Sequence, residues 1–169
     1  MIANRQGRAY FLADGGLDEA AVSQSREALA AYSQAVRLRP DYAEAYNNRG
    51  NVKSNLGHHE EAVADYDRAV HLKPDLADAY INRANAKAAL GQFQDALVDL
   101  ETAISFNPDN VFAFLNRGLL LAELGQFEDA IADLDEAVRL EPEFERAYIV
   151  RGRFRQGTGD CRGTTMNLS

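Results

Sequence analysis

The sequence predicts an all-α protein built from antiparallel pairs of helices that repeat along the chain. Three segments, 43–74, 77–108 and 111–142, match one another position by position. The four prolines of the chain follow one another at intervals of 34 residues, at Pro40, Pro74, Pro108 and Pro142. Within each segment apolar residues recur three and four positions apart, which is the spacing of one helix face. A gap-free period of this length is typical of stacked helical repeats.

Residues 1–42 form a divergent first repeat with an insertion. The half that precedes Pro40 matches the second helix of the later repeats, and residues 4–5 match the Asn-Arg pair of the later first helices. We expect a turn at residues 14–16 and then one long helix over 17–38. A break near Ser23 and Ser25 is the alternative, because serine is a good cap and a poor interior residue.

The three full repeats, 43–76, 77–110 and 111–144, each predict two helices. The first helices are expected at 43–56, 77–90 and 111–124, and the second at 59–72, 93–106 and 127–140. A glycine stands where each first helix must end, and a left-handed cap is its expected role. These glycines are Gly57, Gly91 and Gly125. The proline after each second helix terminates it, and Asp41, Asp75 and Asp109 are expected to form a turn or a cap.

Two columns of alanine occupy fixed places in the second helices, where they would let helix backbones approach closely. They are Ala62, Ala96 and Ala130, and then Ala69, Ala103 and Ala137. Residues 145–169 match one more first helix and the start of its second helix, so this last repeat is incomplete. We interpret 1–169 as a single domain. Both terminal repeats are incomplete, which we interpret as an excised fragment or as natural short caps. The alternative is that the ends pair with other chains.

This pattern resembles the tetratricopeptide repeat, a helix–turn–helix unit of 34 residues. An aromatic residue replaces the family's tryptophan at Tyr46, Tyr80, Phe114 and Tyr148, and the family's glycine position holds Gly50, Ala84, Gly118 and Gly152. The regular departure is arginine in place of leucine, at Arg49, Arg83, Arg117 and Arg151. The resemblance implies a right-handed superhelix whose first helices line a concave groove. It also implies a non-enzymatic scaffold or adaptor that binds a protein or an extended peptide.

Composition bounds the function further. The net charge is −8 and no basic stripe is visible, so we expect no binding to nucleic acid. No apolar run is long enough to cross a membrane. The single cysteine, Cys161, excludes an internal disulfide and suits the cytoplasm or another reducing soluble compartment. His58 and His59 fall in a turn, and we find no catalytic, metal-binding or cofactor-binding constellation, so none is expected.

The candidate binding residues are asparagines, because Asn gains nothing in an exposed helix interior. Asn48, Asn82 and Asn116 recur every 34 residues, and Asn47, Asn51 and Asn85 lie beside them. By the resemblance this side of the first helix lines the groove, where carboxamides suit the backbone of an extended peptide. The alternative is that asparagine ties neighbouring first helices together, and both roles can hold. The later part of the groove becomes apolar and basic, with Phe112, Leu115, Leu119, Arg146 and Arg153.

These residues predict an extended ligand with an apolar anchor and acidic residues beside it. The family's two-carboxylate clamp needs Lys and Arg at places that hold Asn47, Phe112 and Asn116 here. Binding of an Hsp70 or Hsp90 tail by that clamp is therefore not expected. The repeating arginines are expected to pair with Asp65, Asp99 and Asp133 on the second helices. Alternative functions are self-assembly through the terminal repeats and a regulatory region of a larger enzyme.

Overall fold

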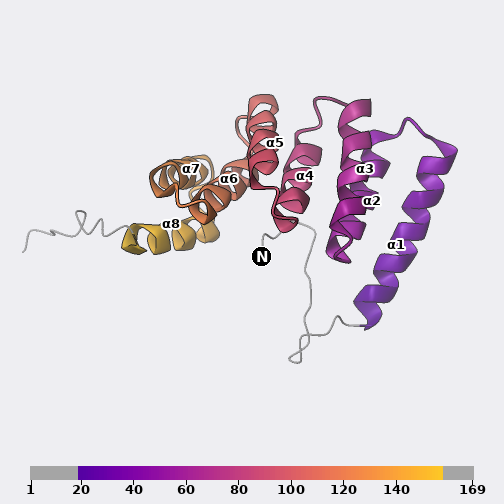
Figure 1. Cartoon of the computed structure of the whole chain (residues 1–169), viewed down its shortest axis with the longest axis horizontal. Coiled ribbons are helices and arrows are strands. Elements are labelled where there is room, and N and C mark those ends of the chain that lie inside the picture. The colour runs from indigo at the N-terminus through magenta and orange to yellow at the C-terminus, as the bar shows by residue number, and fades with distance from the viewer. Residues whose placement is uncertain (1–18, 158–169) are drawn as a thin grey trace, which may run out of the picture. The chain divides into compact units, whose positions relative to one another are not determined.

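The computed structural model describes residues 19–157, and their side chains from 23 to 152. Over this range the chain forms eight α-helices and no strand (Figure 1). They are α1 (Glu19–Leu38), α2 (Ala43–Asn55), α3 (His59–Leu72), α4 (Ala77–Ala89), α5 (Phe93–Phe106), α6 (Val111–Glu123), α7 (Phe127–Leu140) and α8 (Glu145–Gly157). Both helices of every full repeat are therefore present where the sequence predicts them, with each first helix ending one residue early.

The chain divides into two units, which are described separately. Unit 1 is Met1–Phe106 and holds α1 to α5, and unit 2 is Asn107–Ser169 and holds α6 to α8. Within each unit every helix packs against the next one along the chain. In unit 1, α2 also contacts α4, so two first helices are neighbours there. The expected turn at 14–16 and the segment after residue 157 lie outside the described residues.

Each first helix ends at a glycine in the left-handed conformation, as the sequence predicts. Gly57, Gly91 and Gly125 have φ of 82°, 76° and 77°. At the end of α2, Gly57 N–H donates to Ser54 O at 3.0 Å and His58 N–H donates to Lys53 O at 2.9 Å. This pair of bonds is the Schellman motif, which satisfies carbonyls that the helix leaves open.

Of the two roles expected for the aspartates before the first helices, the structure shows the turn. The N-caps of α2 and α4 are Tyr42 and Leu76, and neither side chain makes a capping hydrogen bond. Asp41 and Asp75 each lie one residue before the N-cap. These aspartates are therefore turn residues. The start of α6 is capped by Asn110, whose side chain accepts from the N–H groups of Phe112 and Ala113. In α1 the helix runs unbroken through Ser23 and Ser25, which confirms the expected single helix over its described part.

The core lies where each second helix crosses its neighbours. All six alanines of the two columns are 0% exposed. The residues between them, Tyr66, Leu100 and Leu134, are at most 1% exposed. Within each unit the helix pairs thus bury small residues at their crossings, as stacked repeats do.

Candidate functional site

The arginine of each full repeat forms a two-bond fork with an aspartate of the same repeat. Arg49 Nε lies 2.8 Å from Asp65 Oδ2, and Arg49 Nη2 lies 2.5 Å from Asp65 Oδ1. Arg83 and Asp99 repeat this geometry at 2.9 and 2.5 Å, and Arg117 and Asp133 at 2.7 and 2.7 Å. The predicted pairing of Arg and Asp columns is confirmed. Planar forks of this kind fix orientation as well as supplying energy.

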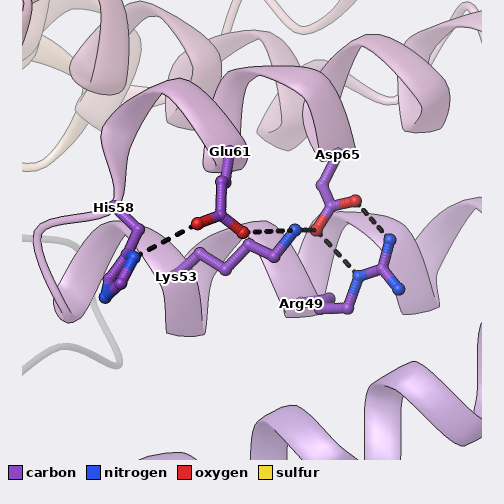
Figure 2. Close-up of polar contacts among 5 residues, drawn as sticks. All are labelled: Arg49, Lys53, His58, Glu61 and Asp65. Atoms are coloured by element: carbon purple, nitrogen blue, oxygen red, sulfur yellow. Dashed lines mark hydrogen bonds and ion pairs between the residues drawn. The ribbon is translucent and has the colours of Figure 1, made fainter.

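A lysine one turn further along the first helix joins this pair in two of the repeats. Lys53 Nζ lies 2.9 Å from Asp65 Oδ2 and 3.5 Å from Glu61 Oε2. Figure 2 shows Asp65 between Arg49 and Lys53, with Glu61 between Lys53 and His58. Lys87 binds Asp99 in the same way at 2.8 Å. The lysines of α2 and α4 therefore turn toward the second helices.

Arg83 also joins two consecutive repeats, which the sequence analysis missed. Its Nη1 donates to Asp67 of α3 at 2.6 Å, while its other nitrogens bind Asp99 of α5. Burial on its own lowers the pKa of Arg83, but the hydrogen bonds to Asp99 and Asp67 outweigh it and raise that pKa. Arg151 of α8 makes the equivalent bond to Asp135 of α7 at 2.7 Å. The repeated spacing of 16 residues between Arg and the preceding Asp is a sequence signal for these contacts.

The arginines also lie over the aromatic residues of the first helices. The Cζ atoms of Arg49 and Arg83 are each 5.3 Å from the ring centroids of Tyr46 and Tyr80, and Arg117 Cζ is 5.8 Å from Phe114. A guanidinium over an aromatic face at this distance is attracted by the ring quadrupole. Each arginine is therefore held from two sides, by the aspartate fork and by the aromatic ring, and it stabilises the repeat.

Two of the candidate asparagines bind each other. Asn82 Nδ2 donates to Asn47 Oδ1 at 3.0 Å, and both residues are 8% exposed. This bond ties α2 to α4, so the tie between neighbouring first helices, which the sequence left open, exists at this place. The bonded residues are 35 positions apart. The repeating column would instead pair Asn48 with Asn82, which are 34 positions apart.

Asn48, Asn51 and Asn85 lie on the same two helices and are partly exposed. Asn51 Oδ1 accepts the hydroxyl of Tyr66 at 2.8 Å. Within residues 23–152 the side-chain amides of Asn48 and Asn85 form no hydrogen bond to another side chain. The amide nitrogen of Asn51 also forms none. No buried side-chain nitrogen or oxygen in that range lacks a partner. These amide groups are therefore accessible to solvent.

The candidate residues of unit 2 fall into a buried and an accessible group. Leu115 and Asn116 are 1% and 3% exposed, so they belong to the core of the repeat. Phe112, Leu119 and Arg146 are partly exposed. Phe112 meets Phe144 edge to face, with ring centroids 5.6 Å apart. The side chain of Arg153, the remaining candidate, lies outside the described part.

Two searches of the described residues concern other kinds of site. No group of three or more His, Cys, Asp and Glu side chains among them is placed to hold a metal ion. No helix among them is both long enough and apolar enough to cross a membrane.

Comparison with known families agrees with this architecture. Residues 43–76, 77–110 and 111–144 each match the model of the tetratricopeptide repeat, and residues 24–57 match a second model described as a TPR repeat. The chain belongs to the tetratricopeptide repeat family. The fold class predicted from the sequence, an all-α solenoid of antiparallel helix pairs, is thereby confirmed.

Solved structures of the family resemble the chain over most of its length. The Arabidopsis OM64 TPR domain is 32% identical, with a TM-score of 0.66, and the match covers 68% of this chain and 95% of that one. The first TPR domain of Spaghetti (RPAP3), bound to the HSP90 peptide SRMEEVD, is 26% identical with a TM-score of 0.67, covering 69% and 93%. A crystal structure of MamA shares the fold at 24% identity, a TM-score of 0.74 and coverage of 83% and 82%. No curated protein sequence matches the chain.

Proposed function

We propose that this protein is a non-enzymatic interaction scaffold that binds an extended segment of a partner protein along α2 and α4. The observation that carries the proposal is the set of accessible amides at Asn48, Asn51 and Asn85 on these two neighbouring helices. A carboxamide offers both donors and an acceptor, which match the main chain of an extended peptide whatever its sequence. We call these three residues the amide face.

The bonded pair beneath this face supports the proposal. Because Asn82 binds Asn47, α2 and α4 are held together by a side-chain bond as well as by packing. A surface whose helices are fixed in advance binds an extended segment with less loss of conformational freedom. Asn47 and Asn82 therefore act in our proposal mainly by supporting the face, since both are nearly buried.

The structure of the RPAP3 domain bound to an HSP90 peptide supports an extended peptide as the class of ligand. The acidic peptide SRMEEVD needs cations, however, and those of α2 and α4 are already bonded to aspartates. Arg49 and Lys53 bind Asp65, and Arg83 and Lys87 bind Asp99. We therefore expect the amide face to bind SRMEEVD poorly.

An apolar anchor of the same partner is proposed for unit 2. Phe112, Leu119 and Arg146 are its accessible members, Leu115 and Asn116 support them from the core, and Arg153 is retained from the sequence. An apolar side chain of the partner fits this set, because Phe112 and Leu119 are partly exposed. Cys161, the single cysteine of the chain, supports a reducing compartment such as the cytoplasm.

The test begins with selection of linear peptides from a random library by the full-length protein. The strongest enriched peptide is then labelled with fluorescein, and its affinity is measured by fluorescence anisotropy. Asn48→Ala and Asn85→Ala should each weaken binding by roughly two- to tenfold, the usual value of one hydrogen bond. Gln94→Ala, which removes an exposed carboxamide from α5, is the matched control and should leave the affinity unchanged.

Two results would contradict the proposal. One is a library that yields no peptide above background, and the other is full affinity in a folded Asn48→Ala/Asn85→Ala variant. A labelled SRMEEVD peptide should bind far more weakly than the enriched one. Equal affinity for SRMEEVD would show that the cations of α2 and α4 are available after all.

Self-assembly remains a second candidate because of the exposed apolar residues of α8. Tyr148 and Ile149 are 42% and 51% exposed, whereas Ile81, at the same repeat position as Ile149, is 6% exposed. Burial of this surface against a second copy would remove it from water. Sedimentation velocity over a wide concentration range tests the idea. Association that Ile149→Asp abolishes supports assembly, and a monomer at every concentration contradicts it.

A further inference from the structure

A buried tyrosine extends from the second helix of repeat 43–76 to the amide face. Tyr66 of α3 is 1% exposed, and its hydroxyl donates to Oδ1 of Asn51 on α2 at 2.8 Å. The equivalent residues of the next two repeats, Leu100 and Leu134, carry no hydroxyl. Among the full repeats, this contact therefore belongs to 43–76 alone.

Gly50 makes the contact possible. A Cβ atom at this position would lie 2.6 Å from Cε1 and 2.9 Å from Cδ1 of the Tyr66 ring, which is closer than carbon atoms approach. The ring is rigid and enclosed, so it cannot move aside as the end of a flexible chain could. In the next repeat Ala84 stands in place of Gly50 and Leu100 in place of Tyr66. The glycine and the tyrosine thus form a matched pair.

The bond has a definite direction. Burial raises the pKa of Tyr66 well above its ordinary value, so the phenol keeps its proton and can donate it. A buried hydroxyl proton needs an acceptor, and the carbonyl oxygen of Asn51 supplies one. The amide nitrogen of Asn51 then occupies the other end of the carboxamide. It has no partner within residues 23–152 and is accessible to solvent.

We infer that Tyr66 is a positioning residue that fixes Asn51 as a hydrogen-bond donor toward the partner segment. The inference rests on the proposed function, and it names the group that is recognised: a main-chain carbonyl oxygen of the extended segment. Asn85, the equivalent of Asn51 on α4, faces a repeat that has Leu100 instead of a tyrosine. Its amide can rotate and offer either its donor or its acceptor, so α2 alone sets the register of the bound segment.

The positioning role is tested first in the free, full-length protein. NMR relaxation of the side-chain amide groups measures how firmly each asparagine is held. Tyr66→Phe keeps the ring and removes the hydroxyl, so the Asn51 amide should become as mobile as that of Asn85, while Asn85 is unchanged. Tyr80→Phe, the same change at a partly buried tyrosine of α4, is the control. An Asn51 amide that is equally ordered with and without the Tyr66 hydroxyl would overturn the inference.

The donor role is tested with the enriched, fluorescein-labelled peptide. Asn51→Asp keeps an oxygen that accepts from Tyr66 but offers no N–H to the segment. A carboxylate oxygen then faces the carbonyl oxygen of the segment, and both are acceptors. The affinity should therefore fall by roughly tenfold or more. Asn85→Asp should cost less than about twofold, since Asn85 can turn its oxygen outward. Full affinity in Asn51→Asp would overturn the donor assignment. A parent protein that binds no peptide would remove the proposed function instead, and the NMR comparison would still decide whether Tyr66 positions Asn51.

Discussion

Repeats 43–76 and 111–144 share one framework and present different chemistry on the first helix. In both, an arginine of the first helix forms a fork with an aspartate of the second, Arg49 with Asp65 and Arg117 with Asp133. In both, the alanine column is fully buried. The first helices themselves differ, with AEAYNNRGNVKSN in α2 and VFAFLNRGLLLAE in α6.

Two of the differences fall outside the Arg–Asp fork and the alanine columns. Asn51 of α2 corresponds to Leu119 of α6, and Lys53 corresponds to Leu121. One repeat therefore offers amides and the other an apolar surface on the same backbone. The comparison teaches that the Arg–Asp fork and the alanines hold the helix pair together in both repeats, while other positions of the first helix change. We propose that these changeable positions specify the partner.

The largest effect is expected from removing the aspartate of the fork. Asp65→Ala removes the fork partner of Arg49 and the nearer of the two carboxylates bound to Lys53, both in a partly buried place. This should lower the free energy of unfolding by about 3 kcal/mol. Asp133→Ala removes an ion-pair partner from Arg117 alone among the described cations and should cost less. Urea denaturation of both variants measures the difference. Equal losses would show that Lys53 adds nothing to the stability of repeat 43–76.

Overpacking the alanine column should cost about 2 kcal/mol in either repeat, because an inserted side chain forces the helices apart. Ala62→Leu and Ala130→Leu probe the column, since both alanines are 0% exposed. Ala64→Leu and Ala132→Leu make the same change at exposed positions of the same helices. Melting temperatures of the four variants compare them. If the buried and exposed changes had the same effect, the alanines would not be at helix crossings.

A smaller and more specific effect is expected at Gly50 of repeat 43–76. Gly50→Ala should cost about 1 kcal/mol or more, because the new methyl group meets the Tyr66 ring at 2.6 Å. In a Tyr66→Leu background, which reproduces the Ala84 and Leu100 pair of the next repeat, Gly50→Ala should cost close to nothing. A double-mutant cycle by urea denaturation measures this coupling. Additive effects would mean that the glycine and the tyrosine do not act as a pair.

Much of the fold could be predicted from the sequence, because the 34-residue period indicates which residues are equivalent in each helix pair. Gly57 and its equivalents mark the helix ends, since only a residue without Cβ adopts their positive φ at low cost. The Arg49 and Asp65 pair could be predicted because both residues recur in all three full repeats. The alanine columns could be predicted for the same reason. A contact that every repeat makes requires the same residue types at a fixed interval, and such a recurrence is visible in a single sequence.

Contacts that occur once were not predicted, and the tie between asparagines of neighbouring first helices was left open as an alternative without its actual partners. Asn82 binds Asn47 and not the equivalent residue Asn48, a choice of partner that depends on side-chain direction. The bond from Tyr66 to Asn51 occurs in one repeat, so no period reveals it. Asn116 and Leu115 were predicted in the groove from their spacing, but spacing does not report depth, and both are nearly buried.

The central claim is that the amides of Asn48, Asn51 and Asn85 contact the partner's main chain. Titration of the full-length protein with the enriched peptide, followed by the NMR resonances of its side-chain amides, tests this most directly. The account predicts that these three amide groups shift together and saturate at one concentration, whereas the Gln94 amide of α5 stays in place. Shifts confined to other residues, with the three amides unmoved at saturation, would contradict the account.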